Sequence, residues 1–181
     1  MPLPGRPGWS WLLGTRLRRW RMRRTLRAAV EHVPSGASVL DAGSGPGYDA
    51  EELARLLPAA KVRRWVLLDP QRLMLLQAGR IVIRRQPDAD RWAAVVGDAA
   101  AIPARDSSFD LVLSLGVLCC MSEMAVAKAI TETVRVLRPG GWLVFGVPPW
   151  RRAQDLESFE RLGLVVVARP RRGGAILQKR A

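Results

Sequence analysis

Short, almost purely apolar runs alternate with longer amphipathic segments along most of this chain. The apolar runs have the length of buried strands and lie at 38–41, 65–69, 93–97, 109–115 and 142–147. The amphipathic segments have helical periodicity and lie at 9–32, after a glycine-rich turn up to 57, and at 70–79, 122–137 and 151–162. Apolar strands separated by helices predict an α/β fold, a parallel sheet with helices on both faces.

The end of the chain follows a different pattern. Two apolar runs, 164–168 and 175–178, flank a turn at 170–174 that contains one proline and two glycines. Such a pair predicts a hairpin, so the last strand should run antiparallel to its neighbours. Together with the earlier runs, this predicts six parallel strands and one reversed strand.

The composition fits a single folded domain. The chain has 181 residues, of which 49% are hydrophobic and 25% are charged. No apolar run approaches the length that spans a bilayer, and the apolar patch at 9–13 precedes the arginines, unlike the apolar region of a signal peptide. Cys119 and Cys120 are adjacent, so we expect a reduced chain in the cytoplasm, with both thiols buried among apolar side chains.

The positive charge is concentrated at the two ends. Residues 1–33 carry eight arginines and one acid, residues 169–181 carry five basic groups and no acid, and the remainder is almost neutral. We therefore divide the chain into a basic extension with a cap helix at 1–35 and a main domain at 36–181. Basic ends favour an anionic partner, although a general preference for arginine on solvated faces would produce the same pattern.

A glycine-rich turn follows the first predicted strand. Gly43, Gly45 and Gly47 stand where the strand passes into a helix, and glycine there lets the backbone turn sharply and approach a ligand. A dinucleotide fingerprint would need a glycine where Tyr48 stands, and no phosphate-loop Gly-Lys-Ser/Thr follows. The turn thus indicates a ligand site without a nucleotide phosphate, or a purely structural bend.

Two carboxylates end the next two predicted strands. Asp69 closes the second strand, from which a carboxylate reaches ribose hydroxyls in open α/β sheets, and Asp98 closes the third, where it could accept from an adenine amino group. The carboxyl ends of parallel strands meet at one edge, so both should lie near the glycine turn. The alternative role for each aspartate is a helix cap.

In this order, the motifs resemble those of class I S-adenosylmethionine-dependent methyltransferases, with the closest likeness to the type-11, ubiquinone/menaquinone-biosynthesis-like group. The resemblance covers about residues 36–180 and rests on five segments: 39–47, 69–75, 97–103, 106–112 and 136–143. It implies a Rossmann-like seven-stranded, mostly parallel sheet with an antiparallel last strand. It also implies S-adenosyl-L-methionine as the cofactor and methyl transfer as the reaction.

The resemblance assigns cofactor contacts residue by residue. Asp41 would act towards the amino group, Asp69 would bind both ribose hydroxyls, and Asp98 would read the adenine edge. The glycine turn would line the methionine part, and the end of the fourth strand would offer backbone to it. The full set is Asp41, Gly43, Ser44, Gly45, Gly47, Tyr48, Asp69, Pro70, Gln71, Asp98, Ala99, Ser114, Leu115 and Gly116.

No catalytic residue and no metal site is assigned. Many relatives carry a histidine shortly after the fourth strand, where this chain has Cys119 and Cys120. The sole histidine, His32, precedes the first strand and is expected to have a structural or surface role. Transfer from a sulfonium mainly requires donor and acceptor to be held in line, and it needs a base only for some acceptors.

The acceptor is the open question. We expect a small molecule most of all. RNA or an anionic lipid surface are the alternatives, bound through Arg16–Arg27 and Arg169–Arg172 with Trp9, Trp11 and Trp20. A non-catalytic binding module with a methyltransferase fold is a further alternative. The sequence does not indicate an oligomeric state.

Overall fold

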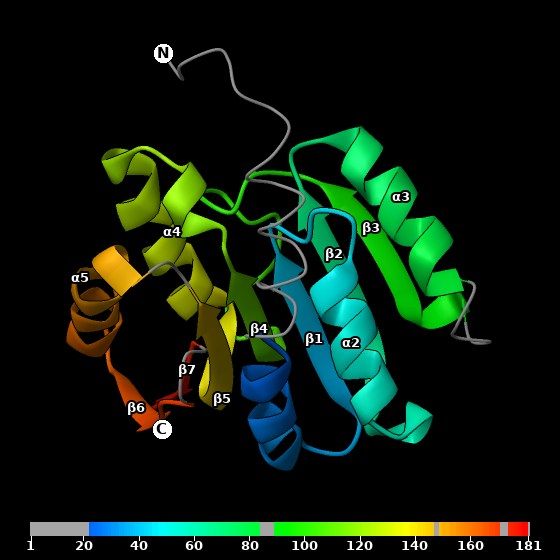
Figure 1. Ribbon diagram of the computed structural model, residues 1–181, viewed down its shortest axis with the longest axis horizontal. Coiled ribbons are helices and arrows are strands. Elements are labelled where there is room, and N and C mark those ends of the chain that lie inside the picture. The colour runs from blue at the N-terminus through cyan, green and yellow to red at the C-terminus, as the bar shows by residue number, and fades with distance from the viewer. Residues whose placement is uncertain (1–21, 84–88, 147–148, 171–173, 181) are drawn as a thin grey trace.

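A computed structural model describes residues 22–83, 89–146, 149–170 and 174–180. In this part of the chain, seven strands form one sheet in the order β3-β2-β1-β4-β5-β7-β6 (Figure 1). β7 runs antiparallel to β5 and β6, and the other neighbours pair in parallel, as predicted. The strands are β1 (Ala37–Ala42), β2 (Val62–Asp69), β3 (Trp92–Val96), β4 (Phe109–Leu115), β5 (Leu137–Gly146), β6 (Leu164–Ala168) and β7 (Ala175–Lys179).

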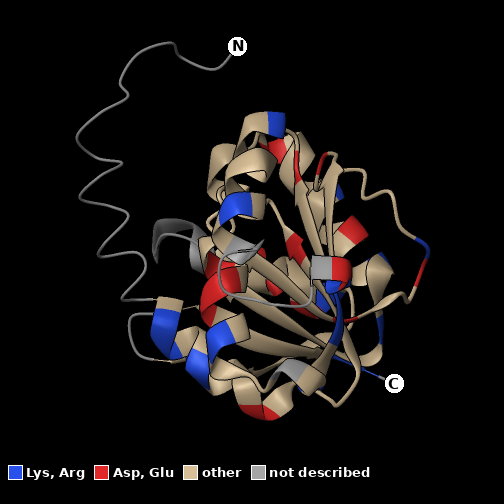
Figure 2. Cartoon of the chain, turned by 90° about the vertical axis from the view of Figure 1, so that its right-hand side faces the viewer, with Lys and Arg blue, Asp and Glu red and all other residues tan. Residues whose placement is uncertain are grey.

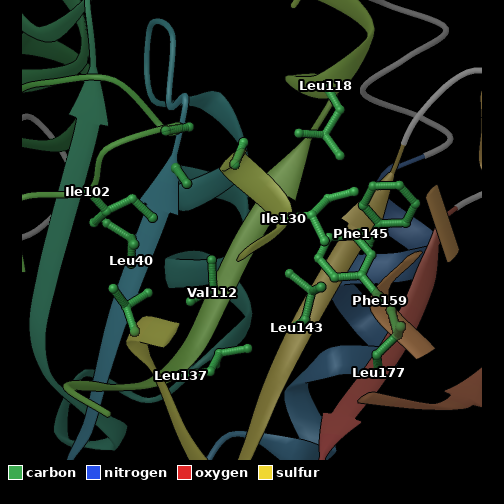
Figure 3. Close-up of a cluster of buried hydrophobic side chains, with 14 of the residues drawn as sticks. Leu40, Ile102, Val112, Leu118, Ile130, Leu137, Leu143, Phe145, Phe159 and Leu177 are labelled. Carbon is green, nitrogen blue, oxygen red and sulfur yellow. The ribbon is translucent and has the colours of Figure 1, made fainter. Parts of the chain in front are cut away.

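Helices cover both faces of the sheet. A helix at 22–29, α2 (Tyr48–Leu56) and α3 (Arg72–Ile83) share one apolar cluster with strand residues such as Val39 and Leu113. α4 (Glu123–Val136) and α5 (Pro149–Arg161) share a second cluster with residues of the opposite face, including Leu40 and Leu143 (Figure 3). Since side chains of a strand point alternately to the two faces, the near-continuous apolar runs supply both clusters.

The start of β5 differs from the prediction. The sequence predicts a helix to 137 and a strand from 142, but the strand begins at Leu137, directly after α4. Leu137 pairs with Phe109 and Trp142 pairs with Leu111, so a bulge with Gly140 at φ +73° absorbs the extra residues. The abrupt end of α4 leaves backbone carbonyls without a helical donor. Lys179 supplies one, because its Nζ donates to the carbonyl of Leu137 at 2.7 Å.

The helix at 22–29 is part of the main core. Met22 lies against Gly146 at the carboxyl end of β5, and the hydroxyl of Thr25 accepts a hydrogen bond from the backbone of Gly174 at 2.8 Å. The helix therefore runs from the carboxyl edge of the sheet, here called the rim, towards its amino edge. Its basic positions appear blue in Figure 2, next to the start of the described chain. The rest of the predicted helix, residues 9–21, lies outside the described residues.

His32 packs on the middle of β5. Its ring stacks on Trp142, with ring centroids 4.1 Å apart and planes inclined by 19°. This contact agrees with the structural role that its place in the sequence predicts.

Candidate functional site

Backbone hydrogen bonds fix the glycine turn to the end of β2. The backbone N–H groups of Gly43 and Ser44 both donate to the carbonyl of Leu68, at 2.8 and 2.9 Å. The N–H of Gly47 donates to the carbonyl of Ser44 at 2.9 Å, and Gly47 is the N-cap of α2, which starts at Tyr48. The turn is thus a fixed part of the rim and brings β1, β2 and α2 together.

The three glycines of the turn have positive φ but different surroundings. A Cβ on Gly43 would lie 2.6 Å from Cγ2 of Val117, and one on Gly47 would lie 2.9 Å from Cβ of Ala78. A Cβ on Gly45 would meet no atom within 4 Å. Protein therefore packs closely on the first and third glycines, while the middle one faces open space. Open space over a bare backbone is what a ligand approaching the turn requires.

Asp69 joins the turn to the end of β2. Its Oδ2 accepts a hydrogen bond from the backbone N–H of Gly45 at 2.9 Å, and its Oδ1 accepts from Gln71 at 2.8 Å. The side chain is buried, whereas Pro70 and Gln71 are exposed beside it. An ionised carboxylate has about four acceptor positions, so these two bonds leave room for hydroxyl donors. The carboxylate thus lies against the glycine turn.

Carboxylates surround the turn. Asp41, Asp49 and Asp69 are all buried, with exposed fractions of 2%, 8% and 7%. A helix N-terminus attracts anions, but the first turn of α2 already carries two acids, Asp49 and Glu51. Added negative charge, such as a phosphate, would be repelled there. The site suits a ligand with positive groups and hydroxyls.

The segment after β3 forms a tight turn at the same rim. Oδ1 of Asp98 accepts from the backbone of Ala100 at 2.9 Å, and its carbonyl accepts from Ala101 at 3.0 Å. Asp98 is exposed and Ala99 is buried. The side chain of Asp98 thus orders its own turn, and its exposure leaves it accessible to a ligand.

An ion-pair cluster on α4 holds the chain that follows this turn. Arg135 donates to the carbonyls of Ile102 and Ala104 at 2.9 and 2.8 Å and to Oδ1 of Asp106 at 2.6 Å. Glu132 accepts from the backbone N–H of Ile102 at 2.7 Å and from Nε of Arg135 at 2.7 Å. Sequence reasoning missed this cluster, because its partners are about thirty residues apart and no motif joins them.

We expect Arg135→Met to lower the free energy of unfolding by about 1–3 kcal/mol at neutral pH, because two backbone carbonyls and Glu132 lose a charged donor. The hydrogen bond from Arg135 lowers the pKa of Glu132 below its ordinary 4.5, against the opposing effect of burial. The stabilisation is therefore complete above pH 4.5 and is lost as the pH falls through the lowered pKa.

Urea unfolding from neutral pH to about pH 3 measures this effect. The wild-type chain should lose stability in acid more steeply than the variant. Arg80→Met is the control, since Arg80 is exposed on α3 and the structure gives it no partner among the described residues. If the free energy of unfolding of wild type and of Arg135→Met fell equally between neutral pH and about pH 3, the role of the cluster would be contradicted.

The end of β4 is more enclosed than the turn. Ser114 and Leu115 are each 2% exposed, and Gly116, at φ +74°, donates its N–H to the carbonyl of Gly146 at 2.6 Å. This N–H is therefore occupied by β5. Of the three residues, only Gly116 is partly exposed beside the turn.

The expectation of buried cysteines is wrong, because Cys119 and Cys120 are both exposed. They lie in the short helix Leu118–Cys120, which buries Leu118 and turns the next two residues outward. Their sulfur atoms lie 3.9 Å apart. Among the described residues, no three His, Cys, Asp or Glu side chains are grouped so as to hold a metal ion.

Comparison with known sequences identifies a family and several relatives. Residues 39–141 match the family model described as a methyltransferase domain. Malonyl-acyl-carrier protein O-methyltransferase of Methylococcus capsulatus is 37% identical over 123 residues, which are 67% of this chain and 41% of that protein. A ubiquinone/menaquinone biosynthesis C-methyltransferase of Hahella chejuensis is 36% identical over 141 residues, covering 74% of this chain and 54% of that protein. The matches thus span about half of these relatives' own length.

Solved structures share the fold at lower sequence identity. An S-adenosylmethionine-dependent methyltransferase from Aquifex aeolicus superposes with a TM-score of 0.68 at 19% identity, covering 94% of this chain and 97% of that one. The cyclase SpnF superposes with a TM-score of 0.61 at 23% identity, covering 92% and 62%. At these identities the likeness shows the Rossmann-like fold, and the cyclase illustrates that this fold alone does not determine a reaction.

Proposed function

Because the chain belongs to the methyltransferase-domain family, as its motifs predicted, we propose that it transfers a methyl group from S-adenosyl-L-methionine to a small-molecule acceptor. The observation that carries this proposal is the open backbone at Gly45, hydrogen-bonded to the buried carboxylate of Asp69. The proposed cofactor carries an ammonium group, a sulfonium and one carboxylate, so its net charge is +1, and it has ribose hydroxyls but no phosphate. These groups fit a turn surrounded by carboxylates.

The proposed contacts follow the rim. Asp69 would accept from the ribose hydroxyls and Asp41 would act towards the ammonium group. The exposed Gln71 and Asp98 would border the adenine from two sides. The glycine turn would lie along the methionine part. The remaining proposed contacts are Gly43, Ser44, Gly47, Tyr48, Pro70, Ala99, Ser114, Leu115 and Gly116.

The bound cofactor would supply a methyl group already activated as a sulfonium. The chain's own residues would then hold the donor in line with the acceptor and exclude water, which accounts for much of the rate of such reactions. The fixed turn and the α4 cluster support this positioning role. No catalytic residue is assigned, and a base is needed only for acceptors that lose a proton.

The acceptor class is proposed from the relatives. The names of three relatives specify malonyl-acyl-carrier protein, demethylmenaquinone and ubiquinone/menaquinone biosynthesis. The groups named there are small organic ones, so we propose a small-molecule acceptor for this chain. Binding of RNA or lipid through the basic ends stays a prediction, because residues 1–21 and 171–173 lie outside the described residues.

Residence in the cytoplasm and the division at residue 35 also stay predictions. Across the described ranges, no helix meets the length and hydrophobicity needed to cross a bilayer.

The test is transfer of a tritiated methyl group from labelled cofactor into fractionated cell extract. We expect label in the small-molecule fraction, and much less label with an Asp69→Ala variant at the same cofactor concentration. Label in RNA or in phospholipid, in place of soluble metabolites or extracted quinones, would overturn the acceptor class and support the basic ends as the binding surface. Cofactor binding without label in any fraction would support the non-catalytic binding module.

A further inference from the structure

In the part of the chain that the structure describes, one half of the sheet has no helix on the face that α4 and α5 cover. α4 packs against β5 and α5 packs against β6, whereas the connection from β3 to β4, residues 97–108, forms no helix. A sheet of parallel strands normally needs cover on both faces. Among the described residues, this connection is what lies over the β1–β2–β3 half, and it leaves a groove.

The groove has an apolar floor and the size of a ligand site. Its volume is about 370 Å³, within the range of small-molecule sites. Figure 3 shows Leu40 and Ile102 together at the margin of the apolar cluster, away from Phe145 and Phe159. The apolar residues of the groove are Leu40, Val66, Leu68, Val95, Ile102, Pro103, Ala104 and Phe109.

One end of the groove is basic. Arg64 and Arg105 line it and both are exposed, and neither guanidinium group has a hydrogen-bond or ion-pair partner among the described residues. No residue of the lining is acidic. The nearby carboxylate of Asp110 already accepts from the backbone of Ser38 at 2.8 Å and pairs with Arg138 at 2.5 Å. The two guanidinium groups therefore remain available to an outside anion.

The apolar and basic ends are separated along β2. Arg64 pairs with Ser38 near the amino ends of the strands, and Leu68 stands four residues further on, about 13 Å away in an extended strand. Leu68 and Pro103 pack against Gly97, so they lie between the groove and the rim turn after β3. The groove is thus separate from the open face of Gly45.

We propose that this groove is a second binding site, for a carboxylate with an extended apolar body. The guanidinium groups of Arg64 and Arg105 bind the carboxylate, and the alkyl chain lies along β2 towards Leu68 and Ile102. Pairing of a guanidinium with the carboxylate sets the orientation of the ligand, and burial of its alkyl chain gives most of the affinity. The inference concerns the groove alone and does not depend on the proposed function.

Calorimetric titration of the intact chain with decanoate tests this site. We expect saturable binding to one site per chain, with at least tenfold weaker binding of decanol, which lacks the charge, and of acetate, which lacks the alkyl chain. Binding of decanol as tight as that of decanoate would overturn the role of the arginines. Absence of decanoate binding at millimolar concentration would overturn the site.

Variants locate the binding. The double variant Arg64→Glu/Arg105→Glu should weaken decanoate binding at least tenfold, and Ala104→Phe should weaken it by filling the groove. Arg80→Glu is the matched control, because Arg80 is exposed on α3 outside the groove, and it should bind like wild type. The four substituted residues are exposed or partly exposed, so the substitutions should not disturb the core. Thermal unfolding checks that each variant folds. Equal affinity of the double variant and the control would place the ligand elsewhere.

Discussion

Asp69→Ala is expected to lower the affinity for S-adenosyl-L-methionine by about 10- to 100-fold. The substitution removes a charged acceptor from the proposed ribose hydroxyls, and hydrogen bonds to charged groups are worth about 1.5–3 kcal/mol. It also leaves the N–H groups of Gly45 and Gln71 without the acceptor that fixes them. The measurement is calorimetric titration with the cofactor.

Two further variants make this result specific. Asp69→Asn keeps the size of the side chain and one acceptor oxygen, so its loss of affinity should be smaller. Asp90→Ala removes an exposed acid next to the start of β3, at the opposite edge of the sheet, and should bind like wild type. Unchanged affinity of a folded Asp69→Ala variant would contradict the proposed ribose contact.

Gly47→Ala is expected to lower the free energy of unfolding by about 2–4 kcal/mol. The residue has φ +78°, where an L side chain costs about 1–2 kcal/mol. Its Cβ would lie 2.9 Å from Cβ and 3.3 Å from Cα of Ala78, and such overpacking typically costs about 1–3 kcal/mol. Because Ala78 belongs to α3, relief would require α2 and α3 to move apart. Chemical denaturation measures the change.

Gly79→Ala is the matched control for this effect. Gly79 follows Ala78 within α3, its φ is not positive, and an added Cβ would meet no atom within 4 Å. Alanine is the better helix former by about 1 kcal/mol, so this variant should be as stable as wild type or more stable. Equal unfolding midpoints for Gly47→Ala and wild type would show that the turn tolerates a side chain and is not tightly packed.

The fold was predictable because its signals are local. Apolar runs of strand length fixed the order of the elements, and the hairpin at 164–178 predicted the reversed strand. The glycine turn and Asp69 were predictable as neighbours because the carboxyl ends of parallel strands meet at one edge. The hydrogen bond between Gly45 and Asp69 bears out that expected proximity.

Features that depend on distant partners were not predictable. Arg135 meets the segment at 102–106 only through the folded sheet, and the early start of β5 is accompanied by a hydrogen bond from Lys179 of the last strand. The cysteines were misjudged because the apolar run around them predicts burial, whereas one short helix turns them outward. The groove arises from a missing helix, which no single residue signals.

Equilibrium dialysis of the intact chain against labelled S-adenosyl-L-methionine tests the central claim most directly, with labelled ATP as the comparison. We expect saturable retention of one cofactor molecule per chain. We also expect much weaker retention of ATP, because the acids at the start of α2 disfavour phosphate. Folded protein that retains no cofactor at millimolar concentration, or retains ATP equally well, would contradict the claim.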